Sequence, residues 1–570
     1  MLNDLMNQVL NFFYDFLSNH FNNQPSNFGP AFDDKMLHLE AIACVLIAFC
    51  IVAFLSIHAL GFILELLWSK ASRASISDAD DNTRVKYKSF DFSMLLEKFR
   101  FKKRYWESTL LGLNAENFFK KFVYINDEDR NKHMVITGQT GCGKTTVITN
   151  MILQDSLKGD RSIVIIDPKG EISTFERIYK MAEISGRADD VLNFSLMDKL
   201  NSNTYNPLLL GSGIDPDVVI ESFIGNYHSD NSYYLDVARS IFPLVYKILN
   251  SSGLPFTVMD VYKYLDNPDV FEVVNKEFYE KYPKSRQYLM TLDSEIRRLN
   301  AQHKDFRLAL IGLFNFLLKF DIPQMQEADS DIDLIECVKN KKIVYFSLPT
   351  NAHPERAKLI ARMLQANLRY ISSMIQTGAL PTKTLVSLFI DEFGSVADLD
   401  FIETLNKSRS SGMMVTLCLQ TMTDLAVISK DYKQRVEEST LNKIYMKQHS
   451  PEECEHIAKS IGTIVTQKKT HQEKIGTYGN KILTGEASIR ETNEYILHPD
   501  KIKQLNSYGQ GYFYSRVNNQ IKCVNFSGFR LNGQSNFIKT PRKNKREGVG
   551  IYDKHDLFSP NYKGNLGGRR

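Results

Sequence analysis

The chain has 570 residues, of which 43% are hydrophobic, and a formal net charge of +4. This length is enough for two or three domains, and the hydrophobic share is that of a globular protein and excludes a wholly disordered one. The small net charge does not by itself indicate a nucleic-acid partner. The seven cysteines form no C-x-x-C pair, which argues against a disulfide scaffold and for reduced thiols in the cytosol.

The first segment along the chain is residues 1–36. Its first 21 residues carry large apolar side chains that can share one helical face, but Asp4 and Asp15 make a membrane span expensive. We therefore expect an amphipathic helix in the membrane interface. A second, polar transmembrane helix, which would return Met1 to the cytoplasm, remains the alternative.

Residues 37–69 contain an apolar run from Ala41 to Trp68. The run exceeds the about 20 residues that cross a bilayer and predicts a transmembrane helix. Basic residues dominate the juxtamembrane segment 70–104, whereas acidic residues outnumber basic ones before the run. The positive-inside rule then places residues 1–36 outside and the rest of the chain in the cytoplasm. We expect the basic segment to contact anionic lipid headgroups.

A complete phosphate-binding loop of the form G-x-x-x-x-G-K-[ST] follows the apolar run Met134–Thr137 and precedes a stretch that can form a helix. Its glycines let backbone N–H groups turn toward phosphate oxygens, and the helix adds its positive N-terminal end. Lys144 is expected to reach the β- and γ-phosphates, and the Thr145 hydroxyl to ligate Mg²⁺. The predicted nucleotide-binding residues are Gly138, Gln139, Thr140, Gly141, Cys142, Gly143, Lys144, Thr145 and Thr146.

Two acidic residues end the apolar run Leu385–Ile390. A carboxylate at the C-terminal edge of such a strand lies where phosphate-loop folds hold Mg²⁺, and so we expect Asp391 to bind the metal. The adjacent Glu392 is expected to act as the general base that polarises an attacking water. A dedicated base beside a metal carboxylate predicts hydrolysis of the nucleotide.

Three more apolar runs, at 163–166, 343–348 and 414–419, end in polar residues or at a proline, as parallel strands of an α/β sheet do. The stretch 209–333 lacks such runs and has helical periodicity. The predicted fold class is α/β, with an all-α domain at 209–333 inserted into a nucleotide-binding domain. That nucleotide-binding domain is expected to comprise residues 105–208 and 334–530.

The C-terminal segment 531–570 is rich in basic residues and glycine, with little material for a core. We predict a disordered tail. Either it has no partner, or it is a basic arm that contacts DNA phosphates or an acidic protein.

Further motifs accompany the phosphate loop and the acidic pair. They are Asp-Pro-Lys-Gly-Glu at 167–171, Tyr-Asn-Pro-Leu at 205–208, Leu348-Pro349 ahead of His353-Pro354-Glu355, Ser-Arg-Ser-Ser-Gly at 408–412 and Leu419-Gln420-Thr421. Together with the membrane segment, this order of motifs from about residue 100 to 530 resembles the conjugative type IV secretion coupling proteins, most closely their TraD branch.

The resemblance implies a hexameric, membrane-anchored ATPase of the RecA-like fold, in its HerA–FtsK division, that uses ATP and Mg²⁺. It also implies two catalytic roles. Gln420 would contact the γ-phosphate or its water, and Arg409 would enter the neighbouring subunit's site as an arginine finger. The residues alone leave structural alternatives open. Gln420 would then be an N-cap or a core amide at a strand end, and Arg409 a favourable partner of the helix dipole.

The resemblance further implies a protein of the bacterial inner membrane that links DNA and its relaxase, within a relaxosome, to a type IV secretion channel. The DNA would be single-stranded and bound without sequence preference, although no basic-aromatic stacking platform indicates this directly. A docking receptor for protein substrates and an FtsK-like translocase of double-stranded DNA remain alternatives. The chain departs from the family in having one clear transmembrane helix and a short C-terminal extension.

Overall fold

The computed structural model describes residues 107–116, 122–210, 214–303, 305–381, 383–475, 481–506 and 508–526, with only the backbone at 467–475 and 481–490. All of them belong to one compact unit, Asp91–Arg570. The predictions for segments 1–36, 37–69, 70–104 and 531–570 lie outside the described residues. Within the described ranges, every helix is too short or too polar to cross a bilayer.

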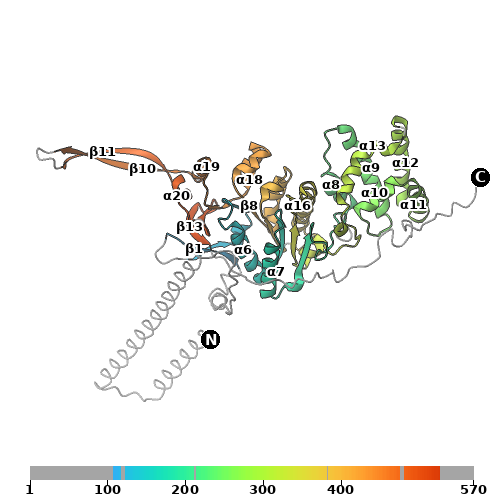
Figure 1. Cartoon of the computed structure of the whole chain (residues 1–570), viewed down its shortest axis with the longest axis horizontal. Coiled ribbons are helices and arrows are strands. Elements are labelled where there is room, and N and C mark those ends of the chain that lie inside the picture. Colours follow the sequence, from blue (N-terminus) through green and yellow to red (C-terminus); the bar gives the residue numbers. More distant parts are fainter. Residues whose placement is uncertain are drawn as a thin grey trace, which may run out of the picture. The chain divides into compact units, whose positions relative to one another are not determined.

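An eleven-stranded sheet organises the described residues, in the order β2-β1-β13-β12-β9-β3-β8-β7-β4-β6-β5 (Figure 1). From β9 to β5 all neighbours are parallel, whereas β12, β13, β1 and β2 pair antiparallel at one edge. The strands of this sheet are β1 Ser108–Asn114, β2 Phe122–Asn126, β3 Met134–Thr137, β4 Arg161–Asp167, β5 Val191–Ser195, β6 Ile343–Ser347, β7 Leu385–Ile390, β8 Met413–Leu419, β9 Asn442–Met446, β12 Gln510–Ser515 and β13 Gln520–Phe526.

The parallel strands are mostly apolar, as is typical of a sheet whose two faces are covered by helices. Every residue of β3, β4 and β8 is buried. The apolar runs found in the sequence become β3, β4, β6, β7 and β8, and β3 and β7 have the bounds of the runs themselves. The antiparallel strands were not predicted from the sequence.

The helices are α5 Asp127–Arg130, α6 Lys144–Lys158, α7 Ile172–Ile184, α8 Pro216–Ile224, α9 Ser232–Asn250, α10 Val258–Asp266, α11 Pro268–Lys281, α12 Ser285–Gln302, α13 Phe306–Ala309, α14 Ile311–Leu317, α15 Leu334–Lys339, α16 Pro354–Gln376, α17 Phe401–Ser408, α18 Lys430–Ser439, α19 Pro451–Ile461 and α20 Pro499–Lys503. The short 3-10 helices are η1 Ala188–Asp190, η2 Leu318–Phe320, η3 Pro323–Met325, η4 Phe393–Ser395, η5 Arg409–Ser411 and η6 Met422–Val427.

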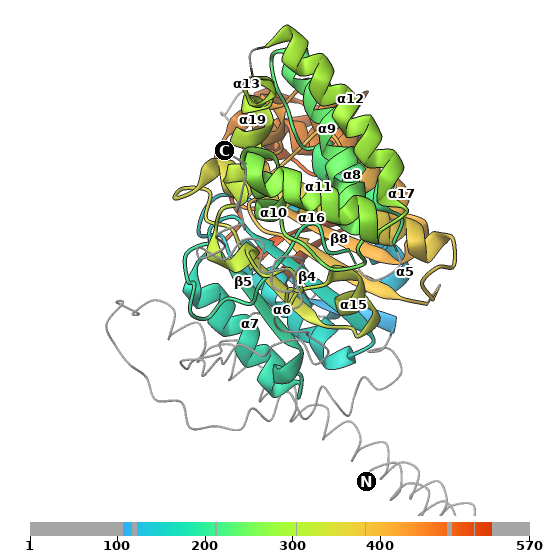
Figure 2. The same ribbon diagram turned by 90° about the vertical axis from the view of Figure 1, so that its right-hand side faces the viewer.

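Two hydrophobic cores lie on the two faces of the sheet. Strand β4 contributes to both, because its alternate side chains point in opposite directions. Ile163 and Ile165 pack with α6 and α7, whereas Val164 and Ile166 pack with α16 and α17. Figure 2 shows α7 on one side of the sheet and α16 on the other, with α9–α12 beyond α16.

The described residues between β5 and β6 form helices and short connections, as the sequence predicts, and pair into a sheet only through the bridge Tyr205–Ile332. The core on the α16 face continues without interruption into α8, α9, α10, α12 and α14. The helices α8–α14 therefore rest on the sheet through apolar contact.

A second sheet consists of β10 Thr463–Ile475 and β11 Lys481–Tyr495, which pair only with each other. This long antiparallel ribbon extends away from the eleven-stranded sheet (Figure 1). The sequence analysis does not predict it.

Candidate nucleotide-binding site

The phosphate loop connects β3 to α6 at the C-terminal edge of the parallel strands. Gly141 and Gly143 have φ angles of 81° and 101°, a left-handed backbone that glycine adopts without steric penalty. Gly138 is required for another reason, since a Cβ there would lie 2.6 Å from Cys142 Sγ and 2.7 Å from Met446 Cβ. The loop glycines thus hold a backbone path that side chains would obstruct.

The loop now makes its own contacts where a nucleotide's phosphates would bind. Lys144 Nζ donates to the carbonyl oxygens of Gly138 and Gln139, the second at 3.1 Å. Thr140 and Gly141 at the tip are exposed, whereas Cys142 is buried with its Sγ 3.7 Å from Met446 Sδ. Phosphate oxygens could take the place of the carbonyls that the Lys144 ammonium contacts.

The proposed metal ligands lie side by side, although 246 positions separate them. Thr145 Oγ1 donates to Asp391 Oδ2 at 3.1 Å, and Asp391 follows the end of β7. A hydroxyl and a carboxylate are the oxygen ligands that Mg²⁺ prefers, and so these residues fit that ion. Burial raises the pKa of the adjacent Asp167, and the charge of Asp391 adds to the effect, while the Tyr345 hydroxyl donates to the same carboxylate.

Glu392 is held by two neighbours from different strand ends. Gln420 Nε2 donates to its Oε1 at 2.9 Å, and Lys169 Nζ lies 3.5 Å from its Oε2. Burial alone would lower the pKa of Lys169, but the charges of Asp391 and Glu392 outweigh it and raise that pKa. Glu392 has a φ of 43°, which is strained for a residue with a side chain and is typical of functional sites.

Arg409 lies elsewhere. It begins η5 directly after α17, before Gly412, whose left-handed φ of 74° ends the helical segment. The Arg409 Nη2 donates to the Ser439 carbonyl at 2.6 Å. The side-chain amide of Asn131 donates to the backbone carbonyl of Arg409. Because β8 starts just after Arg409 and ends just before Gln420, the seven residues of that strand separate them, roughly 20 Å.

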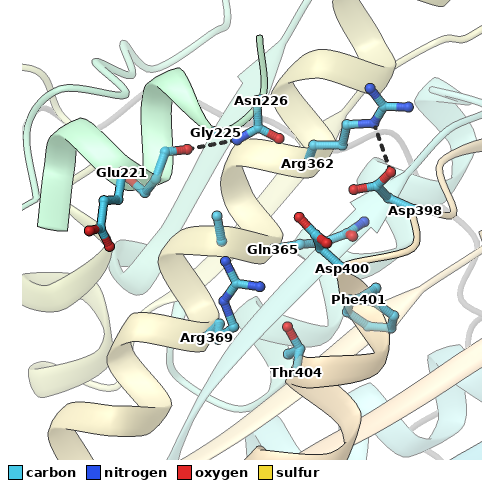
Figure 3. Close-up of a pocket in the computed structure, with 12 residues that line it drawn as sticks. Glu221, Gly225, Asn226, Arg362, Gln365, Arg369, Asp398, Asp400, Phe401 and Thr404 are labelled. Atoms are coloured by element: carbon cyan, nitrogen blue, oxygen red, sulfur yellow. Dashed lines mark hydrogen bonds and ion pairs between the residues drawn. The ribbon is translucent and has the colours of Figure 1, made fainter. Parts of the chain in front are cut away.

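A small cavity of about 40 Å³ lies between α8, α16 and the start of α17 (Figure 3). Arg362 reaches Asp398 there, at 3.5 Å, and Arg369 and Asp400 also line it. Its volume is far below the about 300 Å³ of a small-molecule site. This junction therefore joins the inserted helices to the segment that leads from Glu392 to Arg409, and it does not hold a second nucleotide.

The structure thus brings the phosphate loop, Asp391, Glu392 and Gln420 together, and it keeps Arg409 apart. Asp167 and Lys169 were not predicted as site residues, although both belong to the Asp-Pro-Lys-Gly-Glu motif at the end of β4. Tyr508 was not predicted either, and its hydroxyl lies 2.6 Å from Thr146 Oγ1 across 362 positions. No local pattern signals such a contact.

Comparison with known sequences gives a consistent match. Residues 122–524 match the family described as the type IV secretion-system coupling protein DNA-binding domain. The type 4 coupling protein DotL of Legionella pneumophila is 20% identical over 450 residues, which are 69% of this chain and 57% of DotL. The chain therefore spans little more than half the length of that relative.

Solved structures share the fold. The unbound bacterial conjugative coupling protein TrwBdeltaN70 has a TM-score of 0.52 at 18% identity, over 73% of this chain and 90% of its own. The plasmid coupling protein TrwB in complex with the ATP analogue ADPNP has a TM-score of 0.50 at 19% identity, over 72% and 89%. These likenesses show a common mixed α/β fold with helices on its sheet.

Proposed function

The chain belongs to the type IV secretion-system coupling protein family, and from this we propose that it is an ATPase whose hydrolysis of ATP drives DNA toward a type IV secretion channel. The observation that carries the proposal is the assembled site. The phosphate loop, the Thr145–Asp391 pair and the Glu392–Gln420 pair meet at one sheet edge, although they come from distant parts of the chain.

Each residue has a role that follows from its position. The loop amides and Lys144 bind the phosphates, with Lys144 exchanging its carbonyl contacts for phosphate oxygens. Glu392 accepts a proton from the attacking water, and Gln420, which already contacts Glu392, orients that water. Thr145 and Asp391 would hold Mg²⁺, which supplies charge neutralisation for the departing phosphate.

Arg409 would act on a neighbouring copy of the chain. Its guanidinium cannot reach its own phosphate loop, because the length of β8 lies between the two sheet edges. A finger in trans requires a ring of subunits, for which the family resemblance suggests a hexamer. Gly412 and the contact of Asn131 with the Arg409 carbonyl fix the backbone that would carry this finger.

We also propose binding partners for this protein and a location in the cell. The family description names a DNA-binding domain, which supports DNA as the substrate. We further propose single-stranded DNA delivered with its relaxase, anchoring in the inner membrane by segment 37–69, and contact of segment 70–104 with lipids. The basic tail 531–570 remains a proposed contact for DNA or an acidic partner.

The test is ATP hydrolysis by the full-length chain. Lys144→Ala should lose both nucleotide binding and hydrolysis. Glu392→Gln should bind ATP normally and hydrolyse it about 10²- to 10⁴-fold more slowly, because the general base is lost while the hydrogen bond from Gln420 is kept. Glu355→Gln, an exposed glutamate on α16, is the matched control and should hydrolyse normally.

Ordinary turnover by Glu392→Gln would show that the base is misassigned, and an inactive wild type would refute the ATPase. The DNA dependence of the rate separates the remaining functions. Stimulation by single-stranded DNA supports conjugative transfer, and stimulation by duplex alone supports a double-strand translocase. A rate that no DNA changes favours a docking receptor for proteins.

A further inference from the structure

The loop between α20 and β12 packs against the phosphate loop. The Tyr508 hydroxyl lies 2.6 Å from Thr146 Oγ1, and the backbone N–H of Gly509 donates to the Cys142 carbonyl at 2.9 Å. Gly143 lies against the same residues, since a Cβ there would lie 3.3 Å from the Gly509 backbone nitrogen, which is a tight contact. Nothing in the proposed hydrolysis step uses these contacts.

The order of the strands decides which end of a nucleotide would meet this loop. Strand β3 leads into the phosphate loop, and β8 and β7 on one side of it end at Gln420, Asp391 and Glu392, the residues around the γ-phosphate. Strands β9 and β12 lie on the other side, and Tyr508 comes just before β12. Phosphates that run along the loop from Glu392 therefore leave the sugar and base on the Tyr508 side.

The exposure of Tyr508 is unusual for its surroundings. Tyr512 and Tyr514 on β12 are 7% and 6% exposed and belong to a core, whereas Tyr508 is 56% exposed. Because it is so exposed, the Tyr508 ring can offer a face to a planar base. Among the residues that the structure describes, the recorded partner of its hydroxyl is Thr146, a predicted nucleotide-binding residue. A ligand can replace that contact without disturbing a core.

We propose that Tyr508 receives the base and ribose of the bound nucleoside triphosphate, with its ring against the base and its hydroxyl near the sugar. The inference deepens the proposed ATPase function and rests on it. Tyr508 would then contribute to the affinity for ATP and to the discrimination of ATP from ligands without a base, while the phosphate loop holds the phosphates.

The experiment measures binding of ATP and of inorganic tripolyphosphate to the full-length chain by calorimetry. Tyr508→Ala should weaken ATP binding about tenfold, as expected for loss of a base–aromatic contact, and change tripolyphosphate affinity less than twofold. Tyr508→Phe keeps the ring and should stay within about threefold of wild type for ATP, because it loses only one neutral hydrogen bond at an exposed site. Tyr279 on α11 is also an exposed tyrosine and serves as the control. The Tyr279→Ala variant should bind both ligands normally.

Equal weakening of ATP and tripolyphosphate by Tyr508→Ala would overturn the inference and make the loop a support of the phosphate loop. Unchanged binding of both ligands would overturn it as well. A wild type that binds neither ligand would refute the nucleotide site itself, a failure distinct from the other two.

Discussion

The two edges of the parallel sheet arrange charge in opposite ways, and helix α6 joins them. At the N-terminal edge, Arg130 Nη1 lies 2.7 Å from Asp155 Oδ1, and Arg161 Nη2 lies 2.7 Å from Asp127 Oδ2. The side chains of Arg130, Asp155 and Arg161 are at most 1% exposed. Burial alone would raise the pKa of Asp155, but the two arginines hold it well below its usual range.

At the C-terminal edge the charged groups are held loosely. Lys144 contacts carbonyls of its own loop, and Glu392 and Lys169 face each other at 3.5 Å with side chains 24% and 35% exposed. A ligand can replace these contacts, whereas it cannot enter the closed network at the other end of α6. The difference indicates that one edge serves stability and the other serves binding.

Arg409 gives the strongest test of this division, because it lies at the edge assigned to stability and is proposed to act in catalysis. Arg409→Ala should slow hydrolysis by about 10³- to 10⁵-fold, the range for an arginine finger, and leave ATP binding nearly intact. Steady-state ATPase rates and equilibrium binding measure the two effects. Mixed with Lys144→Ala subunits, the variant should regain activity where an intact loop meets an intact Arg409.

Lys407→Ala is the matched control, since Lys407 is an exposed cation at the end of α17, two positions before Arg409, and pairs with Glu403. It should hydrolyse ATP normally. An absence of rescue in rings proven to contain both subunits would mean that Arg409 is merely structural.

Removing one partner of the closed network should cost stability and not catalysis. Asp155→Asn removes the buried carboxylate that pairs with both Arg130 and Arg161, and it should lower the free energy of unfolding by about 3–5 kcal/mol. Asp293→Asn breaks an exposed pair with Arg297 and should change it by less than about 1 kcal/mol. Chemical denaturation tests both, and equal effects would contradict the contrast between the edges.

His133 makes the N-terminal edge sensitive to pH. Burial lowers the pKa of His133 to about 4. The hydrogen bond to the Leu405 carbonyl raises this pKa, and the charge of Arg409 lowers it further. The folded chain therefore keeps His133 neutral, while the unfolded chain binds a proton below about pH 6.5. The stability that neutral His133 contributes is therefore complete above that pH and is lost as the pH drops. We expect the free energy of unfolding to fall by about 2 kcal/mol at pH 5.

Denaturation curves between pH 7.5 and 5 measure this loss. His133→Asn should flatten the dependence, because asparagine does not titrate and tolerates the left-handed φ of 61° at this position. His228→Gln, at an exposed histidine, should retain the wild-type slope. A slope unchanged in His133→Asn would assign the pH dependence to other groups.

The smallest expected effect concerns Lys169, which pairs with Glu392 at the C-terminal edge. Lys169→Met should lower the catalytic rate about fivefold and leave ATP affinity unchanged, because a partly exposed ion pair contributes up to about 1 kcal/mol to the position of Glu392. Lys169→Arg should recover most of the rate. A loss of ATP binding in Lys169→Met would instead place Lys169 on the phosphates.

Local chemistry was enough to predict much of this site from the sequence. The phosphate loop can be recognised in the sequence because its glycines and Lys144 must lie close together along the chain. Asp391 and Gln420 can be recognised because each directly follows a mostly apolar strand, and Glu392 because it is next to Asp391. The inserted helices, likewise, are indicated by a period that requires no knowledge of distant residues.

Only the tertiary structure decided which distant residues meet. The Lys169–Glu392 pair, the approach of Tyr508 to Thr146 and the position of Arg409 at the far edge all depend on strand order. The antiparallel edge and the β10–β11 ribbon depend on pairing across the chain in the same way. Strand order follows from the packing of whole faces against one another, and that packing has no counterpart in any short stretch of sequence.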